Sequence, residues 1–264
     1  MEARTRRLDT LMVERGLAET RSRAQGLILA GAVRVGDKVV TKAGSRFPPD
    51  EPLSVVQGNR FVSRAGEKLN AAIETFGVGV AGRSCLDAGA STGGFTDVLL
   101  KRGAEKVLSV DVGYGQFDWT LRQDPRVTVL ERTNVRHLTG QDLPFGPDLL
   151  VADLSFISLG VALRTLVSTT PSLLEAVVLV KPQFEAGPDL VGRGGVVADP
   201  GVRAGAILKV VQTFDSLGFG AVDLAPAPVT GRRSGNQEYP LRLLRDAAGV
   251  LDEGRVREVV ASGG

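Results

Sequence analysis

Four charged residues stand next to apolar segments or turns, where a charge is unexpected. Asp153 and Lys181 each follow at least four consecutive apolar residues, Lys68 opens an amphipathic stretch, and Glu238 stands directly before a short apolar segment. The carboxyl ends of parallel strands form the edge where open α/β sheets place their active sites. The set therefore predicts a site in which lysines and carboxylates orient or move a proton. A solvated strand end is the alternative explanation for any one of them.

The single cysteine and the single histidine narrow the chemistry further. Cys85 alone cannot form an internal disulfide, a dithiol redox pair or a thiolate zinc cage, and His137 alone excludes a multi-histidine metal site. We therefore expect no metal ion, and proton transfer by Lys, Asp, Glu or Tyr. We also expect a reduced, cytoplasmic protein, because the sequence shows neither a secretory signal nor an apolar run near the about 18 residues of a membrane span.

A glycine-rich turn between an apolar strand and a helix predicts a nucleoside-cofactor site. Glycines there permit a tight turn and let a ligand approach the backbone. Asp111 ends the next strand 22 residues after Gly89, a spacing that suits a carboxylate bound to a ribose diol. The predicted cofactor contacts are Asp87, Gly89, Ser91, Gly93, Gly94, Phe95, Asp111, Asn134 and Asp153.

Two residues favour S-adenosylmethionine (SAM) over a dinucleotide such as NAD or FAD. Asp87, just before the turn, can attract the ammonium group of the methionine part but would repel a pyrophosphate. Ser91 stands where a dinucleotide fingerprint has its second glycine, so its side chain would crowd a pyrophosphate. A sheet without a cofactor is the third possibility, and Asn134 equally suits an ordinary turn. We expect Phe117 and Trp119 in the core and not as adenine stackers.

Alternating strands and helices surround these residues and indicate an α/β fold. Residues 69, 72, 73 and 76 repeat at helical spacing and predict an amphipathic helix. Continuous apolar strands that alternate with helices argue for a parallel sheet covered on both faces. The expected strands lie at 84–87, 107–112, 127–130, 149–152 and 176–180.

The first 49 residues carry a net charge of +5, with ten Lys/Arg and five Asp/Glu, whereas the rest of the chain sums to −3. Two short helices and a hairpin at 33–40 are predicted within this basic segment. The run at 7–40 resembles the S4 domain, which binds structured RNA through shape and phosphate contacts. A solvated surface is the alternative for so short a segment. The candidate RNA contacts are Arg4, Arg6, Arg7, Arg21, Arg23, Arg34, Lys38 and Lys42.

Five motifs together resemble the TlyA family of rRNA 2′-O-methyltransferases, whose members are also described as haemolysin A-like. In order along the chain, they lie at 63–69, 87–97, 152–156, 180–185 and 235–238. The resemblance implies a Rossmann-like methyltransferase fold with a mostly parallel, seven-stranded sheet and a small N-terminal α+β domain. It also implies an S4-like RNA-binding domain at 1–58, a linker at 59–62 and an FtsJ-like methyltransferase domain at 63–264.

The same resemblance implies the reaction. SAM would be the cofactor, and the partner would be rRNA in the 30S and/or 50S ribosomal subunits, modified at a cytidine 2′-hydroxyl of 16S and/or 23S rRNA. The family's Lys-Asp-Lys-Glu tetrad falls on Lys68, Asp153, Lys181 and Glu238, and we predict Lys181 as the general base. A lysine amine can serve as a base when burial and a second cation lower its pKa from about 10.4.

Two other functions stay open at this point. A protein with this fold could bind rRNA or the ribosome without catalysis, although the intact tetrad argues against that. It could also be a haemolysin or cytolysin, as the family label suggests, but no membrane segment supports this and we expect no membrane partner. Residues 59–62 lack the aromatic-rich linker that affects cofactor binding in some family members, so the resemblance does not extend to that role. The oligomeric state stays open between a monomer and a weak dimer.

Overall fold

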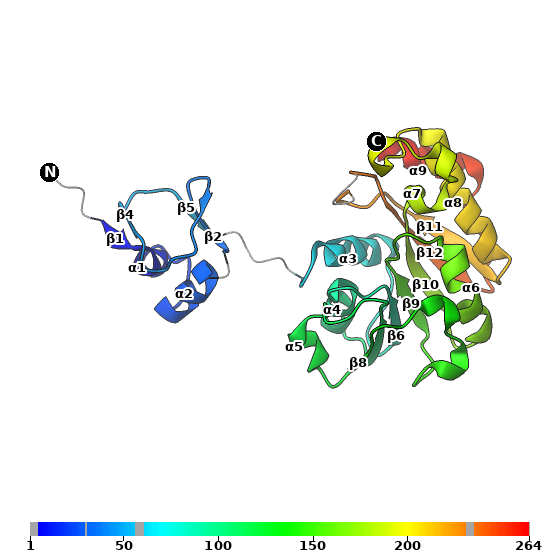
Figure 1. Ribbon diagram of the computed structural model, residues 1–264, viewed down its shortest axis with the longest axis horizontal. Helices are drawn as coiled ribbons and strands as arrows, with labels where there is room; N and C mark the ends of the chain where they lie inside the picture. The colour runs from blue at the N-terminus through cyan, green and yellow to red at the C-terminus, as the bar shows by residue number, and fades with distance from the viewer. Residues whose placement is uncertain (1–4, 30, 56–60, 231–234, 264) are drawn as a thin grey trace. The chain divides into compact units, whose positions relative to one another are not determined.

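The computed structural model divides the chain into two compact units, Met1–Arg60 and Phe61–Gly264 (Figure 1). Phe61 and Val62, which we expected in the linker, belong to the second unit. The Phe61 ring is 3% exposed, and the Val62 N–H donates to Asp97 Oδ2 at 3.0 Å. Arg4 and the first half of the expected linker lie outside the described residues. The structure describes residues 5–29, 31–55, 61–230 and 235–263.

The N-terminal unit packs two short helices against small antiparallel sheets. Its core includes Leu8, Met12, Ile28 and Val33, all fully buried. Strand β2 pairs with β3 in the predicted hairpin and with β5 on its other side, while β1 pairs with β4. The elements are β1 (Arg6–Arg7), α1 (Leu8–Glu14), α2 (Arg21–Leu29), β2 (Val33–Val35), β3 (Lys38–Val39), β4 (Arg46–Phe47) and β5 (Leu53–Val55).

The second unit is built on a seven-stranded sheet with the order β11-β12-β10-β9-β6-β7-β8. Strands β10, β9, β6, β7 and β8 run parallel, and β12 lies antiparallel between β10 and β11. This arrangement confirms the mostly parallel α/β sheet expected from the sequence. The strands are β6 (Ser84–Ala88), β7 (Lys106–Val110), β8 (Val127–Leu130), β9 (Leu149–Ala152), β10 (Glu175–Val180), β11 (Phe219–Leu224) and β12 (Tyr239–Arg245).

Helices cover both faces of this sheet, as its continuously apolar strands require. Alternate residues of one strand enter different cores: Leu150 packs on the side of α6 and α8, whereas Val151 packs on the side of α3 and α4. Figure 1 shows α3 and α4 on one side of the sheet and α6 and α8 on the other. The helices are α3 (Arg64–Phe76), α4 (Gly94–Lys101), α5 (Trp119–Arg122), α6 (Leu159–Thr169), α7 (Pro182–Glu185), α8 (Pro200–Asp215) and α9 (Glu253–Ser262).

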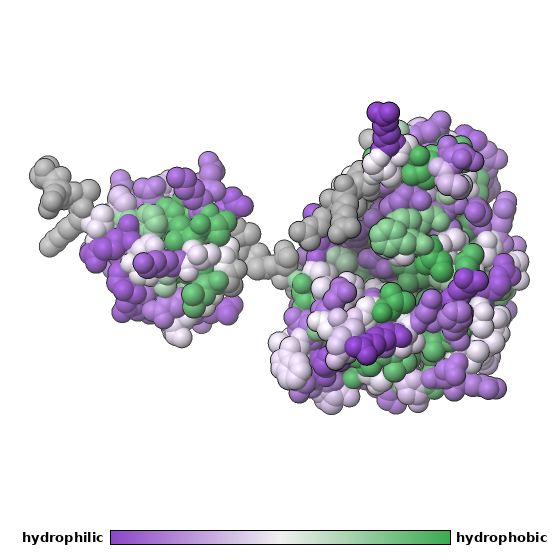
Figure 2. Space-filling view, in the orientation of Figure 1, coloured by the Kyte–Doolittle hydropathy of each residue, from purple (hydrophilic) through white to green (hydrophobic). Residues whose placement is uncertain are grey.

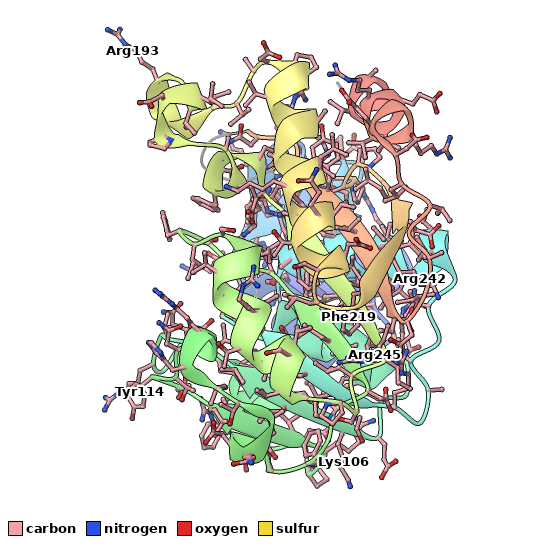
Figure 3. All side chains as sticks on the ribbon, turned by 90° about the vertical axis from the view of Figure 1, so that its right-hand side faces the viewer. Lys106, Tyr114, Arg193, Phe219, Arg242 and Arg245 are labelled. Carbon is pink, nitrogen blue, oxygen red and sulfur yellow. The ribbon has the colours of Figure 1, made fainter. Side chains whose placement is uncertain are left out.

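The amino ends of the central strands are tied by an ion-pair network. Arg83 contacts both Asp148 and Glu175, and Glu175 also accepts from Arg242 Nε at 2.7 Å. Arg242 contacts Asp223 Oδ2 at 3.2 Å as well. Arg245 ends the same strand as Arg242, and its guanidinium lies 4.6 Å from the centre of the Phe219 ring (Figure 3). The network occupies the edge opposite the carboxyl ends and so leaves that edge open for a site.

One expectation about the core is wrong. Phe117 is buried at 7% exposure, as predicted, but Trp119 is 69% exposed. The reason is that α5 is a single turn, and Leu121 supplies its buried side chain. Trp119 is the first residue of that turn and lies outside the packed face.

Adjacent leucines before β10 provide a test of the core. Leu173 is fully buried, whereas Leu174 is 57% exposed. We expect Leu173→Ala to lower the free energy of unfolding by about 2–5 kcal/mol, because it leaves a cavity in a close-packed core. Leu174→Ala should change it by less than about 0.5 kcal/mol. Urea unfolding of the two variants measures the difference, and equal effects would contradict the packing described here.

Candidate active site

Strand register brings charged residues from distant segments to one edge of the sheet. Strands β10 and β12 pair Val180 with Tyr239, so the residues that follow and precede them, Lys181 and Glu238, lie next to each other. Strand β9 pairs with β10 on the opposite side and ends at Ala152, directly before Asp153. Three of the four predicted charged residues therefore meet at the carboxyl end of the parallel strands.

Lys181 is held by two groups from the loop after β9. Its Nζ lies 2.5 Å from Asp153 Oδ1 and donates a hydrogen bond to Ser155 Oγ at 2.9 Å. The Lys181 side chain is 10% exposed and that of Asp153 is 16% exposed. The charges are thus compensated within a site that is almost closed to water, as a buried ion pair requires.

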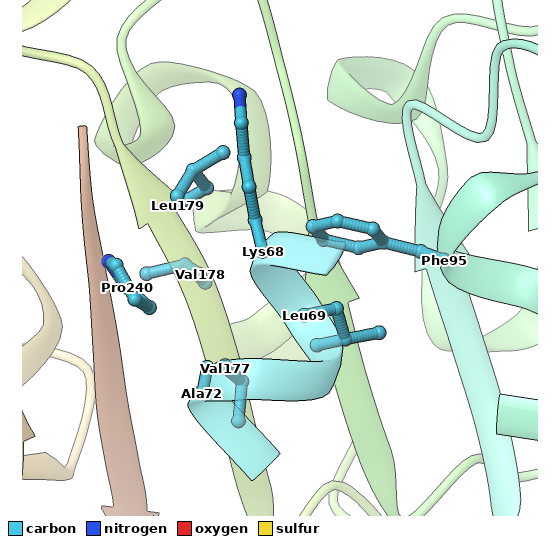
Figure 4. A pocket seen from close by; sticks show the side chains of 8 residues that line it. All are labelled: Lys68, Leu69, Ala72, Phe95, Val177, Val178, Leu179 and Pro240. Carbon is cyan, nitrogen blue, oxygen red and sulfur yellow. The ribbon is translucent and has the colours of Figure 1, made fainter. Parts of the chain in front are cut away.

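Lys68 forms the second ion pair of the site. Its Nζ donates to Glu238 Oε2 at 2.5 Å, and Glu238 is 3% exposed. The aliphatic stem lies among apolar side chains that include Phe95 and Leu179, and Figure 4 shows the amine directed away from the rest of this apolar lining. Packing of the stem fixes where the amine lies, because a long side chain in van der Waals contact has few rotamers left.

The four side chains form an alternating row of charges. Asp153 and Lys181 follow adjacent parallel strands, and Glu238 lies beside Lys181 and binds Lys68. A proton that arrives at Lys181 would be stabilised by the neighbouring carboxylates. Such a row can orient a hydroxyl group and accept its proton without a metal ion or a histidine. Among the described residues, no group of three or more His, Cys, Asp and Glu side chains could hold a metal.

A cavity of about 430 Å³ opens beside this row. Its size falls within the range of small-molecule sites. Loops after the parallel strands β6, β7, β8 and β9 line it. Five of the predicted cofactor contacts take part, namely Gly89, Ser91, Asp111, Asn134 and Asp153.

The Asp111 carboxylate closes the glycine-rich turn. It accepts from the backbone N–H of Ser91 at 2.8 Å and from that of Gly113 at 2.6 Å. Gly89 has φ +86°, and a Cβ there would lie 2.6 Å from the carbonyl oxygen of Asp153. Only glycine fits this crossing of two chain segments, because both the backbone conformation and the space exclude a side chain.

Asp87 lies beneath the turn and is fully buried. Thr96 Oγ1 donates to its Oδ2 at 2.7 Å and lies 2.7 Å from Ser109 Oγ, while no described group donates to its Oδ1. Burial raises the pKa of Asp87 to about 7, and the charges of Asp153 and Asp111 contribute to that rise. A buried carboxylate oxygen without a donor is a candidate partner for a cationic ligand group.

Four predicted cofactor contacts lie outside the cavity lining: the fully buried Asp87, Gly93, Gly94 and Phe95. A Cβ on Gly93 would lie 2.6 Å from the Leu121 side chain, and one on Gly94 would lie 2.1 Å from Ser63 Oγ. These glycines are required for packing beside the turn. Phe95 is 4% exposed and lies in the core with Lys68.

Two polar residues without a predicted role hold the site together. Ser155 accepts from Lys181, as described above. Glu185 Oε1 accepts from the backbone N–H of Leu159 at 2.8 Å and so caps the start of α6, which follows the loop that carries Ser155. Both residues lie within the motifs at 152–156 and 180–185. Their position within these motifs could have marked them as functional residues, but their hydrogen-bond partners depend on the fold.

Two rings join the same pair of segments. The Phe156 ring packs 5.2 Å from that of Phe184, at an angle of 49°. Phe156 is 85% exposed and has φ +66°, a conformation that is costly for a bulky residue. The loop after β9 is thus tied to α7 by a hydrogen bond, a capped helix and an aromatic contact.

A further buried amide anchors the segment before β12. Asn236 is 4% exposed, accepts from the Val197 N–H at 2.9 Å and donates to the Gly195 carbonyl at 2.7 Å. It thereby links the loop at 189–199 to the strand that follows Glu238. Figure 3 shows the Arg193 side chain of that loop projecting away from the rest of the unit.

The predicted RNA contacts that the structure describes lie on several elements of the N-terminal unit and are all at least partly exposed. Arg6 and Arg7 lie on β1, and Figure 2 shows hydrophilic side chains over much of the visible face of this unit. Arg6 is paired with Glu14 at 2.5 Å, and Arg7 and Arg21 are both paired with Asp9. The others are Arg23 on α2, Arg34 on β2, Lys38 on β3 and Lys42 in the loop before β4.

Comparison with known families agrees with this geometry. The FtsJ-like methyltransferase family matches residues 61–244, and the S4 domain matches residues 6–52. The TlyA 16S/23S rRNA (cytidine-2′-O)-methyltransferase of Mycobacterium tuberculosis is 50% identical over 243 residues, which are 91% of this chain and 90% of the relative. This chain belongs to the TlyA family of FtsJ-like methyltransferases.

Other members of the family carry a different name. Hemolysin A of Brachyspira hyodysenteriae is 39% identical to this TlyA family member over 88% of the chain and 97% of the relative. A solved structure from Streptococcus thermophilus, described as a hemolysin, superposes with a TM-score of 0.74 at 35% identity and covers 99% of this chain and 96% of its own. The similarity therefore extends over both units.

The raised pKa of Asp87 predicts a pH dependence of stability. In the unfolded chain an aspartate ionises near pH 4, whereas the folded chain keeps the proton up to about pH 7. The unfolded state thus binds fewer protons between these values, and the unfolding free energy falls as pH rises through this window. In the ligand-free protein, Asp87→Asn should therefore gain stability relative to wild type from about pH 4 to pH 7.

Asp118→Asn is the control for this pH experiment. Asp118 caps α5, and the hydrogen bond from the Thr120 hydroxyl lowers its pKa. Its carboxylate stabilises the fold above its ordinary pKa, so the variant should lose stability relative to wild type as pH rises. Urea unfolding across the pH range measures both variants. If the difference in unfolding free energy between Asp87→Asn and wild type does not change with pH, Asp87 is not a buried carboxyl group with a raised pKa.

Proposed function

We propose that the chain transfers a methyl group from SAM to the 2′-hydroxyl of a cytidine ribose in 16S and/or 23S rRNA. The observation that carries this proposal is the row of alternating charges beside a cavity at the carboxyl edge of the sheet. The activity in the name of the Mycobacterium tuberculosis relative, an rRNA (cytidine-2′-O)-methyltransferase, supports the choice of substrate. The S4 match supports an RNA partner presented by the N-terminal unit.

The residues of the glycine-rich turn fit SAM. Asp111 and the Gly89 backbone would face the nucleoside, and the Asp87 carboxylate would attract the methionine ammonium group. When bound, SAM supplies an electrophilic methyl group on a sulfonium. Ser91 lines the cavity in a left-handed conformation at φ +50°, and its side chain would crowd the pyrophosphate of a dinucleotide.

In the proposed reaction the ribose oxygen forms a bond to the methyl carbon while the carbon–sulfur bond breaks. The hydroxyl proton passes to Lys181 Nζ, which acts as the general base after it has released its own proton. Asp153 lies 2.5 Å from that nitrogen and stabilises the positive charge that develops there. Ser155 limits the rotation of the amine, and the Lys68–Glu238 pair orients the hydroxyl group. The buried setting strengthens each of these interactions.

Two alternatives make different predictions. A non-catalytic RNA-binding factor would bind rRNA but leave it unmethylated, and a haemolysin would lyse membranes without SAM. Among the described residues, no helix is long and apolar enough to cross a membrane. Incubation with tritiated SAM and separate small and large ribosomal subunits distinguishes the three. Label in the ribose of rRNA supports the enzyme, and mapping of the labelled nucleotide identifies the target.

Substitution of the proposed base tests the mechanism. Lys181→Ala should lower the methylation rate by about 10²–10⁴-fold, because the hydroxyl loses its proton acceptor. SAM binding, measured by calorimetry, should be retained because Lys181 does not line the cofactor cavity. Lys106→Ala removes an exposed lysine at the start of β7 and serves as the matched control. A methylation rate of Lys181→Ala near that of the control would refute the assignment.

The RNA-binding role of the N-terminal unit has a separate test. Arg34 and Lys38 lie on the two strands of one hairpin, and both are exposed. Replacing both by alanine should weaken rRNA binding and reduce the slope of log K against log salt by about 1–2, because fewer counterions are released. The control removes Arg255 and Arg257 from α9 and so has the same net charge. Equal slopes for the two double variants would contradict this role.

A further inference from the structure

A fully buried carboxylate lies within the basic N-terminal unit. Asp9 is in the first turn of α1 and is 0% exposed. Arg7 donates to it twice, through Nε at 3.0 Å and Nη2 at 2.8 Å, and Arg21 donates through Nε at 3.1 Å. Gln25 Nε2 adds a hydrogen bond at 2.8 Å. One acidic side chain therefore links three donors that come from β1 and α2.

The two arginines keep part of their guanidinium groups available. The Arg7 side chain is 41% exposed and that of Arg21 is 55% exposed. Among the described residues, neither Nη1 of Arg7 nor the two terminal nitrogens of Arg21 donate to another protein group. These N–H groups have the planar geometry that binds phosphate oxygens in pairs.

The contacts also fix the arginines before any ligand binds. A free arginine side chain has many rotamers, and part of that rotamer entropy is lost when the side chain is immobilised in a complex. Two guanidinium groups close together repel each other, and the carboxylate between them offsets that repulsion. The hydrogen bonds from Arg7, opposed by burial and supported by Gln25 and Arg21, hold the pKa of Asp9 well below its usual range. The carboxylate therefore keeps its charge at neutral pH.

We propose that Asp9 is a positioning residue that fixes Arg7 and Arg21 as one phosphate-binding pair for the RNA backbone. This inference rests on the proposed rRNA-binding role of the N-terminal unit. The inference predicts that removal of Asp9 weakens RNA binding. Net charge alone predicts the opposite, because removing an acidic residue from a basic face strengthens RNA binding. The sign of the effect therefore distinguishes the two explanations.

The test compares two variants of the full chain that gain the same charge. Asp9→Asn removes the charge that Arg7 and Arg21 share. Glu14→Gln removes a charge from the same helix, α1, where Glu14 pairs with Arg6 and both of these side chains are more than 40% exposed. Binding of a fluorescein-labelled rRNA stem-loop is measured by anisotropy over a range of salt concentrations. Glu14→Gln should bind as tightly as wild type or more tightly, with an equal or steeper salt slope.

For Asp9→Asn we expect about tenfold weaker binding and a shallower salt slope, because two side chains must be ordered on binding. Binding as tight as that of Glu14→Gln would overturn the inference. The comparison requires that the wild-type protein binds the stem-loop in a salt-dependent manner. If it does not, the proposed RNA-binding role of the N-terminal unit is refuted, and not the role of Asp9. Loss of structure alone is detected by hydrogen exchange of the N-terminal unit.

Charge-conserving variants keep the inference testable if Asp9→Asn does not fold. Arg7→Lys and Arg21→Lys preserve the net charge but lose the planar group that bonds to Asp9 and to a phosphate at once. Each should weaken binding several-fold while Arg255→Lys on α9 leaves it unchanged. Equal affinities for all three lysine variants would overturn the inference.

Discussion

The site depends on one constraint: charges removed from water must meet partners of opposite sign. Lys68, Asp153, Lys181 and Glu238 are nearly buried, and isolated charges there would be strongly destabilising. The register of β9, β10 and β12 satisfies the constraint by placing the carboxylates beside the amines. The pairs hold the amines in defined positions, and that preorganisation is what methyl transfer to a hydroxyl group needs.

The cavity side of the site depends on two backbone segments that lie very close together, and not on paired charges. The glycine-rich turn crosses the segment after β9 so tightly that Gly89 has no room for a side chain. Asp111 then holds the turn by its backbone N–H groups, and the cavity forms where the loops diverge. Asp153 belongs both to this cavity and to the ion-pair row, so one short segment connects the two parts of the site.

Local patterns predicted the parallel strands of the sheet and the charges that follow them, since strand-end position and helical periodicity are properties of short segments. The pairings were not predictable in that way. Lys68 and Glu238 are separated by 170 positions, and the antiparallel insertion of β12 decides that they meet. The contacts of Ser155 and Glu185 likewise depend on how the loop after β9 packs on α7. The exposure of Trp119 was missed because composition says nothing about the length of a helix.

The late position of β12 has a consequence for synthesis on the ribosome. The parallel strands through β10 precede Lys181 and can pair as they leave the exit tunnel, since domains fold from the N-terminus onward. Lys68 remains without its carboxylate partner until the chain has been extended to Glu238. The nascent protein therefore holds an incomplete row of charges for most of its translation, and the row is completed only as β12 inserts between β10 and β11.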